Sequence, residues 1–277
     1  MPPPALTDFS RLAIHTMTNK PWTLAQCVDA YTAAGVPGIT VWRNVLQDIG
    51  PQSAGRILRD SGLTVVSLAR GGFFPAFEPS KRQAALDDNR LAIDEAAAIG
   101  APLIVLVCGA VPGMSLFDAR QQIRDAIGTL IPHAQATNVK LAIEPLHPMY
   151  AADRSAINTM AQARQVCEHL NSPWVGIAVD VYHTWWDGHL EKEIHLAAAA
   201  NRLLAFHICD WRVNTRDLLN DRGLMGEGCI NIREIRAWVQ AAGFTGYNEV
   251  EIFSTDRWAS DQSQYLDQIK DAYLSFA

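Results

Sequence analysis

Short runs of β-branched and aliphatic residues alternate with longer helical patterns along the whole chain. Eight of these apolar runs predict β-strands: residues 11–17, 37–43, 63–69, 102–109, 139–146, 175–182, 203–211 and 247–254. Several are almost continuously apolar, which is typical of parallel strands that are covered on both faces. The alternation therefore predicts repeated βα units around a parallel sheet.

The segments between the predicted strands carry apolar residues at helical spacing. The clearest helix is 81–99, in which Leu86, Ile93 and Ala97 recur near that spacing. Gly100 directly after it favours the end of a helix. Seven further helices are expected by the same criterion: 23–34, 53–61, 117–136, 155–170, 190–200, 231–242 and 259–275.

Eight strands alternating with eight helices predict a single-domain (β/α)8 barrel, a TIM barrel, over residues 1–277. Such barrels commonly run to about 250 residues as one domain, and no linker rich in Pro, Gly or Ser divides this chain. A doubly wound open sheet is the alternative. It usually has a glycine-rich phosphate loop after its first strand, and the segment HTMTNKPW (15–22) offers none.

The charge balance bears on the kind of partner. Hydrophobic residues make up 49% of the chain and charged residues 19%, and the formal net charge is −6 with no dense run of Lys or Arg. That composition supports a sizeable core. A net negative field repels nucleic acid and anionic membrane surfaces. We expect a small-molecule partner, with neither nucleic acid nor membrane bound.

Five cysteines are widely spaced and none forms a C-x-x-C pair, which predicts reduced and mostly buried thiols. No stretch of about 18 uninterrupted apolar residues occurs, and the first residues lack a basic segment leading into an apolar one. These features predict a soluble, cytoplasmic protein.

Acidic or imidazole side chains fall near the ends of the last four predicted strands: Glu144, Asp180, His207 and the pair Glu249 and Glu251. In barrels of this class the carboxyl ends of the strands face the active site. Burying an ionised carboxylate among Val and Ile costs several kcal/mol unless a cation or a hydrogen-bonded partner offsets it. Any one of these residues fits a capping or ion-paired role equally well, but four consecutive strands indicate one shared cation.

The expected donor set decides which ions fit. Carboxylate oxygens and one imidazole suit a divalent ion, and Mn2+ or Mg2+ are the first expectation. Zn2+ and Co2+ remain compatible with the same donors.

The segments LAIEPLHP, AVDVYHTWWD, AFHICDW and EVEIFS resemble the metal-site strands of the sugar phosphate isomerase/epimerase, or xylose isomerase-like TIM barrel, superfamily. The most similar members by motif are ketose 3-epimerases, hydroxypyruvate isomerases and inosose dehydratases. The resemblance implies that the metal ligands are Glu144, Asp180, His207 and Glu251. Glu249 shares a strand face with Glu251 and is the alternative ligand, but the Glu-Ile-Phe-Ser end favours Glu251.

The resemblance also implies a metal-dependent isomerase or epimerase of a sugar, ketose or related hydroxy-carbonyl compound that works through an enediolate intermediate. Glu144 and Glu251 would be the catalytic pair, one removing a proton and the other returning it. Which of them is the base depends on the handedness of the substrate and stays open. His183, three residues after Asp180, corresponds to a histidine that contacts substrate oxygens in these relatives.

Other side chains near predicted strand ends are candidates for the substrate pocket: His15, His147, Trp186, Arg216 and Arg222. Arginine pairs with two oxygens of an anion through its planar fork, and Arg212 is a third candidate arginine in the segment that follows strand 203–211. This segment, 212–231, exceeds the usual connection of about 2–6 residues and predicts a lid over the substrate.

Three other functions are compatible with parts of this pattern. A dehydratase (lyase) of an inosose or keto-acid type would use the same enolate. A zinc-dependent apurinic-site endonuclease needs more histidine and acidic ligands and a basic surface, whereas this chain has eight histidines and a net negative charge. A barrel that binds a ligand without catalysis does not need acids at all four strand ends. We also expect an unphosphorylated substrate, since no phosphate loop is recognisable, and a homodimer or homotetramer.

Overall fold

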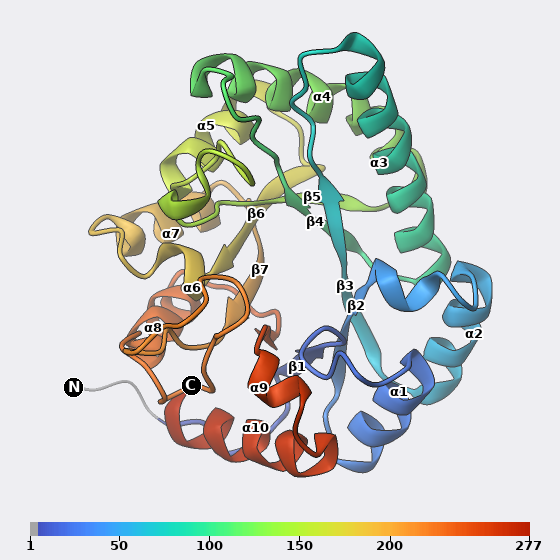
Figure 1. Ribbon diagram of the computed structural model, residues 1–277, viewed down its shortest axis with the longest axis vertical. Coiled ribbons are helices and arrows are strands. Elements are labelled where there is room, and N and C mark those ends of the chain that lie inside the picture. The colour runs from blue at the N-terminus through green and yellow to red at the C-terminus, as the bar shows by residue number, and fades with distance from the viewer. Residues whose placement is uncertain (1–4) are drawn as a thin grey trace.

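Eight parallel strands pair in chain order and close into a barrel (Figure 1). The computed structural model describes residues 5–277. The strands are β1 (Leu12–His15), β2 (Gly38–Trp42), β3 (Thr64–Gly72), β4 (Leu103–Val107), β5 (Lys140–Glu144), β6 (Val175–Asp180), β7 (Leu203–Ile208) and β8 (Asn248–Val250). The (β/α)8 barrel predicted from the alternating pattern is confirmed, and the doubly wound open sheet is wrong.

The first and last strands form the seam of the barrel. β1 pairs with β8 in parallel, with Ala13 opposite Glu249 and Ile14 opposite Val250. Figure 1 shows β1 in blue at the centre of the ring of helices, beside the orange-red C-terminal part of the chain. Side chains from both ends of the sequence therefore reach the same mouth of the barrel.

Helices form a ring around the barrel, as Figure 1 shows. The eight main ones are α1 (Leu24–Ala33), α2 (Pro51–Ser61), α3 (Pro79–Ile99), α4 (Leu116–Thr137), α5 (Met160–Leu170), α7 (Leu190–Ala199), α8 (Ile232–Ala241) and α10 (Gln262–Phe276). Short helical turns lie in the connections: η1 (Arg43–Leu46), η2 (Pro148–Tyr150), α6 (Val181–Thr184) and α9 (Thr255–Trp258). Among residues 5–277, none of the helices has the length and apolarity needed to cross a membrane.

Local sequence signals set many helix ends. Thr23 begins α1 with a capping box in which Gln26 is the partner. Helix α3 starts two residues before the predicted 81–99 because Pro79 fits the first helical turn. It ends at Gly100, whose φ of 79° is the left-handed conformation that glycine tolerates.

The structure corrects the ends of the last three predicted strands. β6 stops at Asp180 because its carboxylate accepts the N–H of Tyr182 at 2.7 Å and caps α6, so the predicted strand residues Val181 and Tyr182 are helical. β7 stops at Ile208, three residues before the predicted end. β8 stops at Val250, four residues before the predicted end, although Glu251 still donates its N–H to Ile208.

Small and aliphatic side chains fill the barrel interior below the mouth. Ala142, Ala178 and Ala205 form one buried cluster with Leu103 and Val105. Each alanine lies two residues before a polar residue at a strand end, and alternate residues of a strand point to the same face. The alanines therefore form a packed floor, and the polar residues lie one layer above it.

The cysteines are free, and four of them, Cys27, Cys108, Cys167 and Cys209, are buried, while Cys229 is exposed. This arrangement agrees with the prediction of reduced and mostly buried thiols.

Candidate metal centre

Four side chains from the carboxyl ends of β5, β6, β7 and β8 meet at the mouth of the barrel. Glu144, Asp180 and His207 belong to β5, β6 and β7, and Glu251 follows the last residue of β8. Each offers one ligand atom, and these four atoms all lie within 4.8 Å of one another. All four residues are buried, so their charges face one another with little water between them.

The donor set fits a divalent cation. Nδ1 of His207 lies 3.0 Å from Oε1 of Glu144 and 3.9 Å from Oε2 of Glu251. Three carboxylates at this separation repel one another unless positive charge lies between them. Oxygen donors with one imidazole match the preferences of Mn2+ or Mg2+ and are compatible with Zn2+ or Co2+.

The pKa values of these groups reflect the crowding of charge. Burial raises the pKa of Asp180 well above its usual range, and Glu251 and Glu144 raise it further while Arg222 opposes them. Burial alone would lower the pKa of His207, but Glu249 and the hydrogen bond with Glu144 raise it to about 10. Side chains whose pKa values are shifted this far from their ordinary range are typical of functional sites.

Glu249 lies outside this group of four. Its Oε2 accepts hydrogen bonds from Oγ1 of Thr40 at 2.5 Å and from Oγ of Ser67 at 3.0 Å. The nearest approach to the histidine of the group is 3.7 Å, between the same oxygen and Nε2 of His207. Hydroxyl donors from β2 and β3 therefore hold Glu249 below the mouth, and Glu251 is the carboxylate that reaches it.

His15 lies inside the cluster and is fully buried, not at the mouth. Its Nδ1 accepts the indole N–H of Trp42 at 3.1 Å and lies 3.3 Å from Oε1 of Glu251. With His207 and Glu251 it forms a second group of three side chains that could hold an ion. The structure thus places His15 beside the candidate ligands.

Arg222 and His183 lie against one side of the group formed by Glu144, Asp180, His207 and Glu251. Nη1 of Arg222 donates to Oδ2 of Asp180 at 3.2 Å and to Oε2 of Glu251 at 2.9 Å, and its Nη2 lies 3.3 Å from Nε2 of His183. The guanidinium packs over the ring of Tyr182 at 4.3 Å. Burial and the charge of Arg222 lower the pKa of His183 well below its usual range, so the imidazole is neutral.

His147 and Trp186 support His183 from the side. The backbone N–H of His147 donates to Nδ1 of His183 at 3.3 Å, and the indole N–H of Trp186 donates to the carbonyl of His183 at 2.8 Å. The rings of His147 and Trp186 pack edge to face, 5.7 Å apart. Neither lines the cavity described below, so both touch His183 and not the open space above the cluster.

Arg216 and Arg212 lie in the segment after β7 and are engaged elsewhere. Nη2 of Arg216 donates to Asp221 at 2.6 Å and to Asp256 at 2.5 Å, and its side chain is 60% exposed. Arg212 donates to the same Asp221 at 2.8 Å. The structure does not bring either arginine to the cavity, because both hold the loop together.

The predicted lid segment, 212–231, lies against one side of the mouth. The carboxylate of Asp210 accepts four backbone N–H groups, those of Trp211, Gly226, Gly228 and Ile230. The hydroxyls of Tyr150 and Tyr182 both donate to the carbonyl of Leu218, at 2.6 and 2.9 Å. These bonds fix the segment where it lines the cavity.

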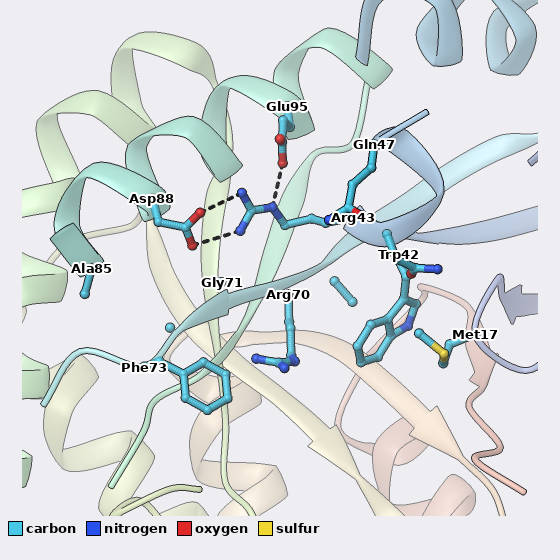
Figure 2. Close-up of a pocket in the computed structure, with 13 residues that line it drawn as sticks. Met17, Trp42, Arg43, Gln47, Arg70, Gly71, Phe73, Ala85, Asp88 and Glu95 are labelled. Atoms are coloured by element: carbon cyan, nitrogen blue, oxygen red, sulfur yellow. Dashed lines mark hydrogen bonds and ion pairs between the residues drawn. The ribbon is translucent and has the colours of Figure 1, made fainter. Parts of the chain in front are cut away.

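A cavity of about 240 Å3 opens above the cluster. Its floor includes Glu144, His183, Arg222 and Glu251. Its outer part is lined by Lys20, Arg70 and Arg154, and a hollow of about 610 Å3 adjoins it at Arg70, Trp42, Met17 and Phe73. Figure 2 shows this second hollow, with Arg70 between Phe73 and Trp42.

The sequence reasoning missed the three outer cations. Arg70 lies near the end of β3, so the strand-end rule applied to Leu-Ala-Arg-Gly-Gly would have found it. Lys20 and Arg154 belong to loops, where no sequence pattern indicated that they face a cavity.

The sequence profile of the Xylose isomerase-like TIM barrel family matches residues 28–269. Among curated proteins, none matches the chain. Among solved structures, protein SMc04130 from Sinorhizobium meliloti 1021 is 46% identical, with a TM-score of 0.93 over 96% of this chain and 98% of that chain.

Two further solved structures share the fold at lower identity. The IOLI protein, with a bound zinc atom, is 18% identical with a TM-score of 0.82, over 95% of this chain and 96% of that one. A D-psicose 3-epimerase, solved in the presence of D-fructose, is 14% identical with a TM-score of 0.77 over the same shares of the two chains.

Proposed function

We propose that this chain, which belongs to the xylose isomerase-like TIM barrel family, is a divalent-metal-dependent isomerase or epimerase of a sugar, ketose or related hydroxy-carbonyl compound. One observation carries the proposal. Two carboxylates, Glu144 and Glu251, line the floor of one cavity and belong to the same compact group as Asp180 and His207.

The residues that would hold the ion are Glu144, Asp180, His207 and Glu251. A divalent ion bound there would polarise the carbonyl and the adjacent hydroxyl of a substrate, which makes the neighbouring C–H acidic. We propose Mn2+ or Mg2+, with Zn2+ and Co2+ as the ions to compare. The hydroxyl donors of Thr40 and Ser67 hold Glu249 below this set as a fixed negative charge.

Glu144 and Glu251 are the proposed proton carriers. They come from β5 and from the end of β8, two strands that are not neighbours, so their carboxylates approach the cavity from different sides. One takes a proton from the carbon beside the carbonyl, the C–H electron pair becomes the C=C bond of an enediolate, and the π pair of the carbonyl moves to its oxygen. The other returns a proton to a carbon of the enediolate, and the place of return decides between epimer and isomer.

Arg222 and His183 would stabilise the negative oxygen of the enediolate. Arg222 supplies a buried positive charge beside Glu251, where little water weakens its effect. Because Nδ1 of the neutral imidazole of His183 accepts the N–H of His147, its Nε2 carries the proton and can donate one hydrogen bond to a substrate oxygen. Two hydrogen bonds orient that imidazole. His147 donates its backbone N–H to Nδ1 of the ring, and Trp186 donates its indole N–H to the backbone carbonyl of His183.

Solvent deuterium tests the proposed proton transfer. We expect the protein with Mn2+ in D2O to introduce deuterium beside the carbonyl of at least one of D-fructose, D-psicose, D-fructuronate, D-fructose 6-phosphate and hydroxypyruvate. Glu144→Gln and Glu251→Gln should each reduce exchange at least 100-fold, whereas the exposed Glu168→Gln should retain it. Absence of exchange with all five compounds contradicts the proposal.

The same experiment distinguishes a dehydratase (lyase) from an isomerase or epimerase. A dehydratase would release water after forming the same enolate, so mass spectrometry would show a product lighter by one water. Its appearance without recovery of deuterated substrate would replace the isomerase by a dehydratase acting at the same residues.

A further inference from the structure

Three cations line the outer part of the cavity without a carboxylate partner. Lys20, Arg70 and Arg154 form no ion pair with any residue in the part of the chain that the structure describes, 5–277, and their side chains make no hydrogen bond there. Most other arginines around the mouth are paired, as Arg212, Arg216 and Arg222 show. A protein with a net charge of −6 thus keeps three positive groups unneutralised at one place.

Arg70 is held over an aromatic ring and away from the nearest acids. Its guanidinium carbon lies 4.3 Å from the ring centroid of Phe73. The acids of the adjoining hollow, Asp88 and Glu95, are occupied by Arg43 at 2.9 and 2.6 Å. In Figure 2 the dashed lines join only those three residues, and Arg70 points away from them.

Lys20 and Arg154 are supported in the same manner. Nζ of Lys20 lies 4.4 Å from the ring centroid of Trp258, and the guanidinium of Arg154 lies 5.5 Å from that of Tyr150. Contact with an aromatic face holds a cation in position while leaving its hydrogen-bond donors free. The three cations are therefore positioned but not neutralised.

Two cations, Arg154 and Arg43, and two carboxylates, Glu144 and Asp88, act on the charge of Arg70, and Arg154 has the largest effect of the four. Burial lowers the pKa of Arg70, Arg154 lowers it further, and Glu144 on the cavity floor opposes that effect. Arg70 and Arg154 line the same cavity, and two like charges in one cavity raise its free energy when it is empty. An anion between Arg70 and Arg154 would remove that repulsion and accept their free donors.

We propose that the outer part of the cavity binds an anionic group, a carboxylate or a phosphate, at the end of the substrate remote from Glu144 and Glu251. This inference rests on the proposed function, and it narrows the substrate to a sugar acid or a sugar phosphate. A carboxylate at this place would agree with the expectation of an unphosphorylated substrate, whereas a phosphate would contradict it. Arg70 is the main recognition residue, because its planar fork can pair with two oxygens of either group.

Three ketoses that differ only at the far carbon test the proposal. D-fructose is neutral there, D-fructuronate carries a carboxylate and D-fructose 6-phosphate a phosphate. Isothermal titration of the Mn2+-loaded protein should give at least tenfold tighter binding of one anionic ketose than of D-fructose. The relative affinity of the two anionic compounds identifies the carboxylate or the phosphate as the natural group.

Matched variants assign the preference to the cations. Arg70→Gln and Arg154→Gln should each reduce the preference for the anionic ketose over D-fructose about tenfold without changing the affinity for D-fructose. Arg70→Lys should keep part of that preference. Arg90→Gln, which removes an exposed arginine of α3 that pairs with Asp87, should leave it unchanged. Circular dichroism of each variant shows that the fold is intact.

The outcomes separate this inference from the proposed function. Equal affinity for the three ketoses, no measurable binding of any of them, or a preference that survives in both Arg70→Gln and Arg154→Gln overturns the anion site. Deuterium exchange with an equal affinity for all three would leave the isomerase standing without the anion site. Tighter binding of an anionic ketose without exchange would support the anion site and contradict the isomerase.

Discussion

Glu249 and Glu251 lie two residues apart on the same side of the chain, yet different partners hold their carboxylates. Hydroxyls of Thr40 and Ser67 hold Glu249, and Arg222 contacts Glu251 at 2.9 Å. Two residues of strand rise, about 6.6 Å, separate the carboxylate that hydroxyl groups hold from the candidate ligand. The two residues should therefore respond differently to the same substitution.

At this scale we predict that Glu251→Gln lowers the affinity for Mn2+ at least 100-fold, because it removes a ligand. Glu249→Gln should lower it only about tenfold, as expected for a group that acts through the imidazole of His207. Isothermal titration with Mn2+ measures both, and Glu168→Gln is the control. The reverse ranking of the two variants would make Glu249 the ligand.

The residues that chemistry requires at strand ends were accessible from the sequence. Glu144, Asp180, His207 and Glu251 were expected together, and their ligand atoms lie within 4.8 Å. Arg70 was missed for a physical reason. Arg70 stays without an acidic partner because Arg43 pairs with Asp88 and Glu95, the two acids of α3 that line the same hollow. Which charges remain unpaired depends on such tertiary contacts, and the sequence does not show them.

Helix α2 packs against α3 so closely at Gly55 that no side chain would fit there. A Cβ atom added at Gly55 would lie 2.3 Å from the carbonyl oxygen of Ala98, which is backbone and cannot rotate away. At Gly128 in α4, an added Cβ would meet only the flexible end of Leu170 at 3.2 Å. The same substitution therefore has opposite consequences in the two helices.

We predict that Gly55→Ala lowers the free energy of unfolding by about 1–3 kcal/mol, because the forced separation of the helices outweighs the gain in helix propensity of about 1 kcal/mol. Gly128→Ala should be neutral or stabilising by up to about 1 kcal/mol. Urea unfolding followed by circular dichroism measures both. Equal effects of the two variants would contradict the close packing of α2 on α3.

The loop after β7 depends on Asp221, which Arg216 and Arg212 contact at 2.6 and 2.8 Å. Hydrogen bonds from Arg216 lower the pKa of Asp221 to about 2, against a smaller opposing effect of burial. A carboxyl whose pKa is lower in the folded state than in the unfolded chain stabilises the fold when it is ionised. Its contribution is complete above about pH 4 and is lost as the pH falls toward 2.

Asp221→Asn should therefore cost about 1 kcal/mol at pH 7, a value reduced for the screening that solvent gives exposed arginines. The difference from the unsubstituted protein should shrink as the pH falls below 4. Urea unfolding at pH 7, 5 and 3.5 measures it. A difference that stays constant over this range would show that the charge of Asp221 does not stabilise the loop.

Element types were easier to derive from the sequence than element ends. All eight strands and the eight main helices lie where the apolar pattern predicted them. The ends of β6 and β7 differ from the predicted ends because the carboxylates of Asp180 and Asp210 accept hydrogen bonds from backbone N–H groups of later residues. Such hydrogen bonds override the apolar pattern, which alone would extend the strands.

For the whole molecule, the candidate ligands tie four consecutive strands together, and β8 in turn closes on β1. An ion that binds this arrangement would bind only the folded barrel, because the unfolded chain separates the ligands. Binding would therefore stabilise the entire fold by mass action.

We predict that Mn2+ at 100 times its dissociation constant raises the free energy of unfolding by about 2.7 kcal/mol. That value corresponds to roughly 5–10 °C in the melting temperature. Differential scanning calorimetry measures the shift, and excess EDTA should reverse it. Asp180→Asn should abolish the shift, and an equal shift in this variant would indicate that the ion binds elsewhere.

The seam between β1 and β8 also sets an order in time. His15 is synthesised well before Glu251, which lies 3.3 Å from it in the folded protein. Chains fold from the N-terminal side as they emerge, but this cluster waits for the last strand. An ion could therefore bind this set of ligands only after β8 has joined the barrel.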